Sequence, residues 1–400
     1  MLFSRIIIII SIINRHYKCL NGSVNSFFPY NTWIIPFFFF TSGIIFTKSE
    51  RNKNFSQFIL SVFEKVLIPA LFMNICYGII STVMNHYQIV TYGQDLSFYN
   101  LLISPFFYND QFKNSIYLWL FFQLFIIELI AGSAYYFLSK IPENKYKLRC
   151  FLLLLAVSFL TAFVCLRLGC RPKDFDKEKM LIIRTGYLSF FFVLGLFYGS
   201  FIRNFFEKYP YPVLGCYLAL ICQVIASFFD GVYYPYDPYT MNMKGLKIDL
   251  MPFFSFLCAA VFIICLARVL SPVLSRSRLL NSIGNDSDCI LCHFQFFGIM
   301  IGVVTLLICA YHGNYRFFDF FDSAAFKNED CWAAFEQSEN GRRRMPYFII
   351  PFFGPVLTVK FVRKFPDRRI QFLICSLIIF ILAALFIMIG RHYQNFLRSI

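Results

Sequence analysis

Ionisable side chains inside long apolar segments are the first candidates for chemistry, because such groups are costly to bury. Arg5 and His16 stand eleven residues apart. In an α-helix this spacing puts them within about 20° of each other around the axis and about 16 Å apart along it. A cation and an imidazole on one helix face suit a long anionic substrate whose reactive end reaches a base, since histidine titrates near neutral pH. An ordinary helix flanked by polar groups is the alternative.

Three further ionisable residues lie well inside apolar segments, namely Glu128, Arg184 and His293. The alternatives to a functional role are a neutral Glu128, a Glu128 paired with Arg184, and a purely structural His293. Charged side chains near segment ends can instead extend their polar tips to the membrane interface. Those in such positions are Glu64, Lys65, Arg268 and Lys360.

The run Cys289-Ile290-Leu291-Cys292-His293 has the spacing of a c-type haem attachment site. It lies within an apolar segment, and a chain with fourteen cysteines makes such a match by chance. No second cysteine pair lies at a spacing that would complete a zinc site. Most other cysteines lie in apolar runs, where a free thiol packs as a small hydrophobe. We therefore expect no metal and no tightly bound cofactor.

The composition places all of these residues in a membrane. Hydrophobic residues make up 58% of the chain, charged residues 15% and aromatic residues 20%, and the mean hydropathy is +0.61. These values exclude disorder and argue against a soluble globular fold. The net charge of +15 comes from lysines and arginines scattered between apolar segments. Since no basic face could follow a phosphate backbone, we expect no nucleic-acid partner.

Eleven apolar segments approach the length of about 20 residues that a helix needs to cross a bilayer. They run near 1–21, 31–47, 62–84, 115–138, 149–167, 181–202, 211–229, 250–270, 288–311, 346–362 and 371–390. The sequence therefore predicts an all-α polytopic membrane protein with about 10–11 transmembrane helices. We expect one membrane-embedded domain over residues 1–400, with 371–390 as a potential extra C-terminal helix.

Positive charge in short loops predicts the orientation of the first helices. The loop after the second segment carries Lys48, Arg51, Lys53 and Lys65. This puts the 47–65 loop and the N-terminus in the cytoplasm. For the later helices the distribution of charge does not decide which loops are cytoplasmic, because the basic loop 167–179 would then lie on the outer side. The first segment begins at Met1 and is followed by no small-residue cleavage site, so a short helix or an upstream start is favoured over a signal peptide.

Several segments, in this order, resemble motifs of the membrane-bound acyltransferase-3 family, which O-acylates bacterial surface glycans. They are Arg5-x10-His16, Pro36–Gly43 (PFFFFTSG) with Ile44–Phe46, Lys65–Pro69 (KVLIP), Trp119-Leu120 with Gln123-Leu124, Arg184 followed by Phe190–Gly195 (FFFVLG), and Ile283–His293. The chain departs from the family pattern ahead of Arg5, where an acidic residue is usual. It also has Lys65 in place of the paired arginines that usually precede the third helix.

The resemblance implies transfer of an acyl group, most often acetyl, from cytoplasmic acyl-CoA to a hydroxyl of a cell-surface or lipid-linked glycan. It places the protein in the bacterial inner membrane as a multi-pass protein. His16 is then expected to act as the general base for the acceptor hydroxyl or as an acyl relay, with Glu128 orienting its imidazole. Acetyl-CoA, or another acyl-CoA, would be a co-substrate, held through its phosphates or thioester. The residues expected to contact it are Arg5, Lys65, Arg51 and Arg184.

The acceptor is expected to contact His293 and the 230–249 loop, through Tyr234, Tyr236 and Asp237. Aromatic faces beside a carboxylate suit a sugar, although tyrosines also belong in an interfacial belt. The expected partners are the lipid bilayer, the glycan acceptor and polysaccharide-assembly proteins. Two other functions remain open from the sequence. One is a transporter or flippase for glycan precursors, which should show pseudo-repeats that this chain lacks; the other is an inactive member with a scaffolding role.

Overall fold

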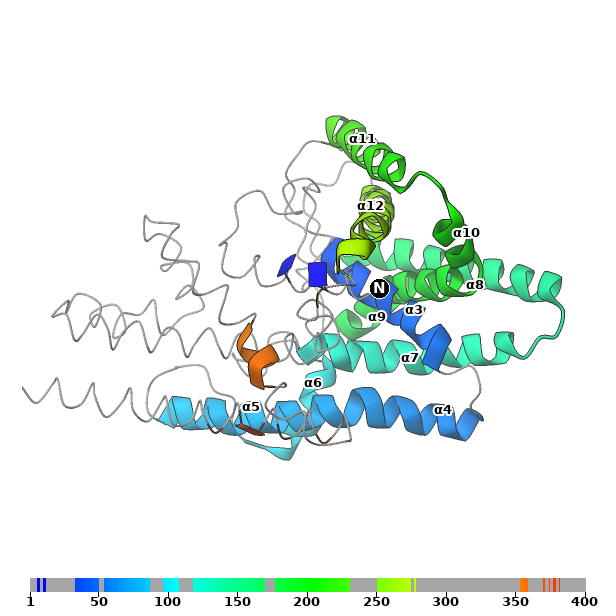
Figure 1. The fold of residues 1–400 in the computed structure, drawn as a ribbon. Helices are drawn as coiled ribbons and strands as arrows, with labels where there is room; N and C mark the ends of the chain where they lie inside the picture. Colours follow the sequence, from blue (N-terminus) through cyan, green and yellow to red (C-terminus); the bar gives the residue numbers. More distant parts are fainter. Residues whose placement is uncertain are drawn as a thin grey trace, which may run out of the picture. The chain divides into compact units, whose positions relative to one another are not determined.

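The structure is a computed structural model, and all regular elements that it describes are helices (Figure 1). It describes residues 6–7, 10–11, 33–49, 54–86, 96–107, 118–169, 177–230, 250–274, 277, 353–358, 370, 374, 377–378 and 381. Five of the described helices are long and apolar enough to cross a membrane. The predicted all-α polytopic membrane fold is therefore confirmed. Helices suit this setting because each satisfies its own backbone hydrogen bonds where water is absent.

The chain divides into two compact units. The first comprises Met1–Ser11, Gly22–Ile68 and Leu120–Gly284, and the second comprises Ile12–Asn21, Pro69–Trp119 and Asn285–Ile400. The first unit holds α3 (Ile34–Ser49), α4 (Phe55–Val62), η2 (Phe63–Leu67), most of α7 (Leu118–Ser139), α8 (Asn144–Gly169), α9 (Lys177–Phe197), η6 (Tyr198–Ile202), α10 (Arg203–Lys208), α11 (Pro212–Asp230) and α12 (Met251–Leu274). The prediction of one domain over 1–400 stays a prediction.

The second unit holds most of α5 (Ile68–His86), η3 (Tyr99–Ile103) and α6 (Ser104–Phe107). The amide nitrogen Nδ2 of the buried Asn74 on α5 donates to the carbonyl oxygen of Leu101 at 2.7 Å. This bond ties the short helical segment to α5, because a buried amide must find a partner.

Seven of the eleven predicted spans correspond to described helices: 31–47, 62–84, 115–138, 149–167, 181–202, 211–229 and 250–270. The other four lie wholly or mostly outside the described residues. Described cysteines are free thiols. Cys165 packs at Gly186 and Cys265 at Gly215, as expected for small hydrophobic side chains.

A close helix crossing joins α3 to α9 at two glycines. A Cβ atom on Gly43 would overlap the carbonyl oxygen of Phe192, and one on Gly195 would overlap the carbonyl oxygen of Phe40. One turn farther on, a Cβ on Gly199 would lie 2.7 Å from Oγ1 of Thr47. Small residues allow helix backbones to approach in a membrane, where dispersion contacts replace the hydrophobic effect. Gly43 and Gly195 are therefore the points at which the backbones of α3 and α9 approach each other.

The phenylalanine run 37–40 belongs to the core of the first unit. Phe37, Phe39 and Phe40 are at most 3% exposed. The ring of Phe256 on α12 lies 5.8 Å from that of Phe40 and 4.6 Å from that of Phe191 on α9. Edge-to-face and tilted contacts at these distances are the favourable arrangements for aromatic pairs. The run therefore packs α3 against α9 and α12 instead of facing lipid.

Ring contacts show which helices run in the same direction. Phe38 contacts Phe121 and Phe46 contacts Tyr135, at 6.0 Å and 6.1 Å between ring centroids, so α3 and α7 are parallel. The glycine crossing shows that α9 is parallel to α3. α12 is parallel to α9, since Phe253 contacts Phe191 near the start of α12 and Arg268 contacts Phe206 near its end.

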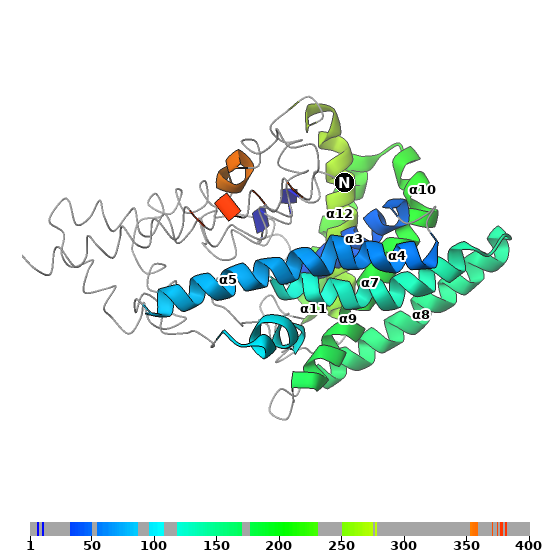
Figure 2. The ribbon, with the colours of Figure 1, turned by 90° about the horizontal axis from the view of Figure 1, so that it is seen from below.

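α4, α8 and α11 run the opposite way. Phe63 of η2, which continues α4, contacts Phe125, whereas the earlier Phe58 contacts Tyr136. Figures 1 and 2 show α8 alongside α9, and α8 is antiparallel to it because Phe159 contacts Phe190 while Phe151 contacts Phe201. α11 is antiparallel to α12, since Gly215 meets Cys265.

These directions bring the ends of α3, α7, α10 and α12 to one end of the first unit, together with the starts of α4, α8 and α11. We call this the basic end, after the cations described there: Lys140, Lys145, Lys147, Arg149, Arg203, Lys208 and Arg268. The only carboxylates among the described residues of these helix ends are Glu143 and Glu207. The basic end includes the place where α3 gives way to α4, which the sequence assigns to the cytoplasm. An excess of lysine and arginine at one end is typical of the cytoplasmic side.

Candidate functional site

The structure describes three of the residues to which the sequence assigns a catalytic or binding role: Lys65, Glu128 and Arg184. The others lie outside the described residues: Arg5, His16, Arg51, Tyr234, Tyr236, Asp237 and His293. Their roles stay predictions. Each of the three described residues belongs to a different helix of the first unit, so their positions along the bundle can be compared.

Lys65 lies in the middle of a helix and not at its end. The helix that was expected from residue 62 begins at Phe55, because the backbone N–H of Asn54 donates to Oε1 of Gln57 at 3.2 Å, one half of a capping box. The helix continues through η2, where the backbone N–H of Ile68 donates to the carbonyl of Phe63. Pro69 lacks an N–H for the carbonyl of Lys65, which accounts for the wider π turn at this point. The exposed Lys65 is therefore about 15 Å along from the helix start.

Glu128 lies on the face of α7 that meets α3. It is midway between Phe121 and Tyr135, which contact Phe38 and Phe46 of α3. Ser42 is midway between those two phenylalanines, so the half-buried Glu128 lies at the level of Ser42, between two aromatic layers. Both residues belong to apolar helices, α7 being long enough to cross a bilayer and α3 somewhat shorter. Glu128 and Ser42 therefore put polar side chains at one depth of an otherwise apolar α3–α7 contact.

The opposite face of α7 meets α9 near Arg184. Nε2 of Gln123 donates to Oγ1 of Thr185 at 2.5 Å, which sets the register of the two helices. In this register Glu128 and Arg184 are about six residues, or roughly 9 Å, apart along the bundle axis. Glu128 also points about 140° away from Gln123 around α7. The alternative in which Glu128 pairs with Arg184 stays a prediction, and it would require their side chains to span this axial offset.

Arg184 lies far from the basic end. It precedes Arg203 by 19 residues of a continuous helix, or about 28 Å along the axis. Its side chain is 5% exposed, in a helix that spans the first unit. A buried arginine at membrane depth is a functional candidate. Its position does not suit contact with a ligand held at the basic end.

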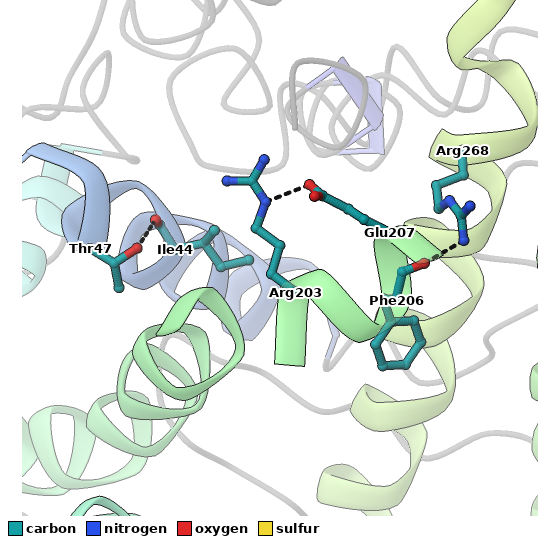
Figure 3. A network of polar contacts seen from close by, with 6 residues as sticks. All are labelled: Ile44, Thr47, Arg203, Phe206, Glu207 and Arg268. Carbon is teal, nitrogen blue, oxygen red and sulfur yellow. Dashed lines mark hydrogen bonds and ion pairs between the residues drawn. The ribbon is translucent and has the colours of Figure 1, made fainter. Parts of the chain in front are cut away.

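A polar cluster that the sequence did not predict lies at the basic end, between α10 and α12 (Figure 3). Nη1 of Arg268 donates to the carbonyl oxygens of Phe206 and Tyr209, the second at 2.7 Å. Nε of Arg203 donates to Oε1 of Glu207 at 2.6 Å. Arg268 is half-buried at this end of the bundle, and there it binds the carbonyl groups that the end of α10 leaves without helical partners.

Thr47 and Tyr198 complete the surroundings of this cluster. Oγ1 of Thr47 donates to the carbonyl of Ile44 at 2.8 Å, and Thr47 packs against Gly199 at the start of the cluster. Tyr198 lies within electrostatic range of Arg203, Glu207 and Arg268. The i, i+4 spacing of Arg203 and Glu207 was the one signal in the sequence that could have pointed to an ion pair here.

Arg268→Met is expected to lower the stability of the protein by about 2 kcal/mol, because a charged donor to two helix-end carbonyls is lost and the carbonyls are left without it. Thermal unfolding of the detergent-purified variant should show a lower midpoint than wild type. Arg149→Met is the matched control, since Arg149 is exposed at the same end and its guanidinium lies 6.0 Å from the Tyr146 ring of its own helix, with no bond to another helix among the described residues. Equal midpoints for Arg268→Met and wild type would contradict the capping role.

These features define a multi-pass membrane protein with several polar residues at membrane depth and a basic end. The family model described as an acyltransferase domain, that of the acyltransferase-3 family, matches residues 4–320, and the chain belongs to this family. No curated protein and no solved structure matches the chain. Membership makes the protein a membrane acyltransferase and confirms the resemblance seen in the sequence motifs. The match includes the first predicted span, with Arg5 and His16.

Proposed function

We propose that this protein transfers an acyl group, acetyl in the first instance, from cytoplasmic acyl-CoA to a hydroxyl of a cell-surface or lipid-linked glycan in the bacterial inner membrane. The observation that carries the proposal is the family match over residues 4–320, which begins just before Arg5 and includes the Arg-x10-His pattern. It favours an acyltransferase over the transporter or flippase, because Arg-x10-His has no evident use in a flippase.

In the proposed reaction, His16 takes the proton of the acceptor hydroxyl as its oxygen attacks the thioester carbonyl. The carbon–sulfur bond then breaks, and the proton passes from the imidazolium to the leaving CoA thiolate. In the relay alternative, His16 first accepts the acyl group and then passes it to the sugar. In both versions a carboxylate that holds the imidazole in position assists, and we assign this role to Glu128.

We propose different roles for the candidate residues, some in contact with the acyl donor and others in contact with the acceptor. Arg5, Arg51 and Lys65 are proposed to contact the acyl-CoA, whose phosphates arrive from the cytoplasm. Arg184 is about 28 Å from the basic end along α9, so it is better placed for the acceptor side than for the donor phosphates. The proposed acceptor contacts are His293, Tyr234, Tyr236 and Asp237, and polysaccharide-assembly proteins are the proposed partners.

Deletion of the gene is expected to remove the O-acetyl signals of the host's surface polysaccharide in proton NMR spectra. A wild-type complement should restore them, and the total amount of polysaccharide should stay unchanged. Loss of the whole polysaccharide from the surface would instead favour a transporter or flippase. Unchanged spectra, with O-acyl content also unchanged by mass spectrometry, would contradict the proposed activity.

A further inference from the structure

Two polar side chains on neighbouring helices, α11 and α12, are fully buried without a hydrogen-bond partner. Gln223 on α11 is 1% exposed, and neither its Nε2 nor its Oε1 atom has a partner among the described residues. Ser255 on α12 is 0% exposed, and its Oγ atom likewise has no partner in the described part of the chain. Buried polar groups are nearly always hydrogen-bonded, so these three atoms require an explanation.

The hydroxyl group of Ser255 does not bond to its own helix, although other buried hydroxyl groups of the first unit do. Oγ of Ser158 donates to the carbonyl oxygen of Leu155 at 2.9 Å, and Oγ1 of Thr41 donates to that of Phe38 at 2.9 Å. A bond to the preceding turn is the common way in which a hydroxyl group is satisfied inside a helix. The Ser255 hydroxyl is therefore available to a partner outside α12.

The register of α11 and α12 puts Gln223 and Ser255 opposite each other. Sγ of Cys216 on α11 donates to the carbonyl oxygen of Phe262 on α12 at 3.7 Å. Gln223 follows Cys216 by seven residues, and Ser255 precedes Phe262 by seven. Seven residues fall within about 20° of two helical turns. Because the helices are antiparallel, the second pair repeats the arrangement of the first, two turns farther from the basic end.

The two helices are still close together at this level. Cys258 of α12 lies within electrostatic range of Cys222, the residue before Gln223. On α11 the buried positions Gly215, Ala219 and Gln223 follow one another at intervals of four residues and form one stripe. Since Gly215 meets α12, the same stripe carries the Gln223 side chain into the α11–α12 interface.

This part of the interface lies at membrane depth. α12 is long and apolar enough to cross a bilayer, and α11 contains a shorter apolar helix over Pro212–Ile225. Gln223 is eleven residues, or about 16 Å, along α11 from its start at the basic end. A polar group buried here without a partner is costly in free energy, because neither the apolar side chains nor the lipid can replace its hydrogen bonds.

We infer that Gln223 and Ser255 form a binding site for water between α11 and α12. Water both donates and accepts hydrogen bonds, so it can bridge the amide of one side chain to the hydroxyl of the other without direct contact between them. A buried water typically makes about three hydrogen bonds to groups that otherwise lack partners. The enclosure of both side chains suits a ligand of this size. The bound water joins α11, whose outer face is exposed, to α12, and this role does not depend on the proposed acyl transfer.

The test measures thermal unfolding midpoints of the full-length protein in nanodiscs. Gln223→Met and Ser255→Ala each take one partner from the water and leave the other polar group unpaired, so each should lower the midpoint by about 2–4 °C. The double variant removes the whole polar site and should return to within about 1 °C of wild type. Ser158→Ala is the matched control for Ser255→Ala, since its hydroxyl bonds within its own helix; its shift should be the same with and without Gln223→Met.

The signs and the additivity of these shifts separate shared water from two unrelated polar groups. If Gln223 and Ser255 are simply unpaired, each apolar replacement relieves a cost, so both single variants should be more stable than wild type and their shifts should add. That result would overturn the inference. Losses of stability that add in the double variant would also overturn it, because they show that the two side chains share no partner.

Proton-detected solid-state NMR of the wild-type protein in liposomes tests for the water directly, even if a variant fails to fold. With glutamine labelled by ¹⁵N, magnetisation should pass from water to the side-chain amide of Gln223. The transfer should weaken in Ser255→Ala and stay unchanged in Ser158→Ala. A wild-type Gln223 amide that receives no magnetisation from water would show a dry interface and contradict the inference, whatever the outcome for acyl transfer.

Discussion

Gly195→Val is expected to prevent the α3–α9 crossing from forming and to remove most folded protein from the membrane. A Cβ atom at this position would overlap the carbonyl group of Phe40, and it would lie 3.2 Å from the Cα atom of Gly43. Both obstacles are backbone, which cannot rotate away as a side chain can. The cost should exceed the roughly 1–3 kcal/mol of ordinary overpacking, a large part of the roughly 5–15 kcal/mol that stabilises a typical fold.

Fluorescence-detected size-exclusion chromatography of a tagged variant measures the folded fraction. Gly195→Ala should act in the same direction, since the Cβ atom itself overlaps the backbone of α3. Gly215→Ala is its matched control, because the atom nearest the new methyl group would be Sγ of Cys265, at 2.6 Å. That side chain can adopt another rotamer, so the control should keep most of the wild-type yield. A Gly195→Ala protein as abundant and monodisperse as wild type would show that the helices do not cross this closely.

His16→Ala is expected to abolish O-acylation while leaving the amount of protein in the membrane unchanged. If His16 is the general base, acyl transfer should fall by about 100- to 10,000-fold. Complementation of the deletion strain with this variant, followed by proton NMR of the polysaccharide, gives the in vivo result. Purified protein with acyl-CoA and a glycan acceptor gives the rate.

His86→Ala is the control for loss of a histidine, since His86 ends α5 and is assigned no role. The relay alternative predicts, in addition, a hydroxylamine-sensitive acyl group on the wild-type protein and none on His16→Ala. Activity close to wild type in His16→Ala, at equal protein level, would show that the Arg-x10-His spacing does not mark the reacting histidine.

The helices themselves followed from the sequence, but several boundaries did not. The span placed at 62–84 begins at Phe55, because Asn54 and Gln57 cap a polar start that an apolar window does not register. Lys65, which was predicted near a helix end, therefore lies in a helix interior. Such errors arise because hydropathy detects the membrane-embedded part of a helix and not its capped extension.

The sequence predicted which residue types belong to the candidate site, but only part of where they lie relative to one another. Glu128 could be placed in a span from the sequence, but its position at the level of Ser42 follows from the contacts of α3 with α7. Arg268 was assigned to the interface because its position near a span end is all that the sequence shows. Its actual partners, the carbonyls of Phe206 and Tyr209, are 59 or more residues away in the chain.

The sequence by itself determined that this chain is an all-α membrane protein and pointed to its acyltransferase family. Both conclusions depend on short stretches of sequence. In a bilayer each helix must satisfy its own backbone hydrogen bonds, so a run of about 20 apolar residues predicts a membrane span whatever the rest of the chain does. Only the tertiary structure decided which spans meet. The motifs Pro36–Gly43 and Phe190–Gly195 cross each other at their glycines, and that pairing depends on side-chain shape between segments about 150 residues apart, which no hydropathy pattern contains.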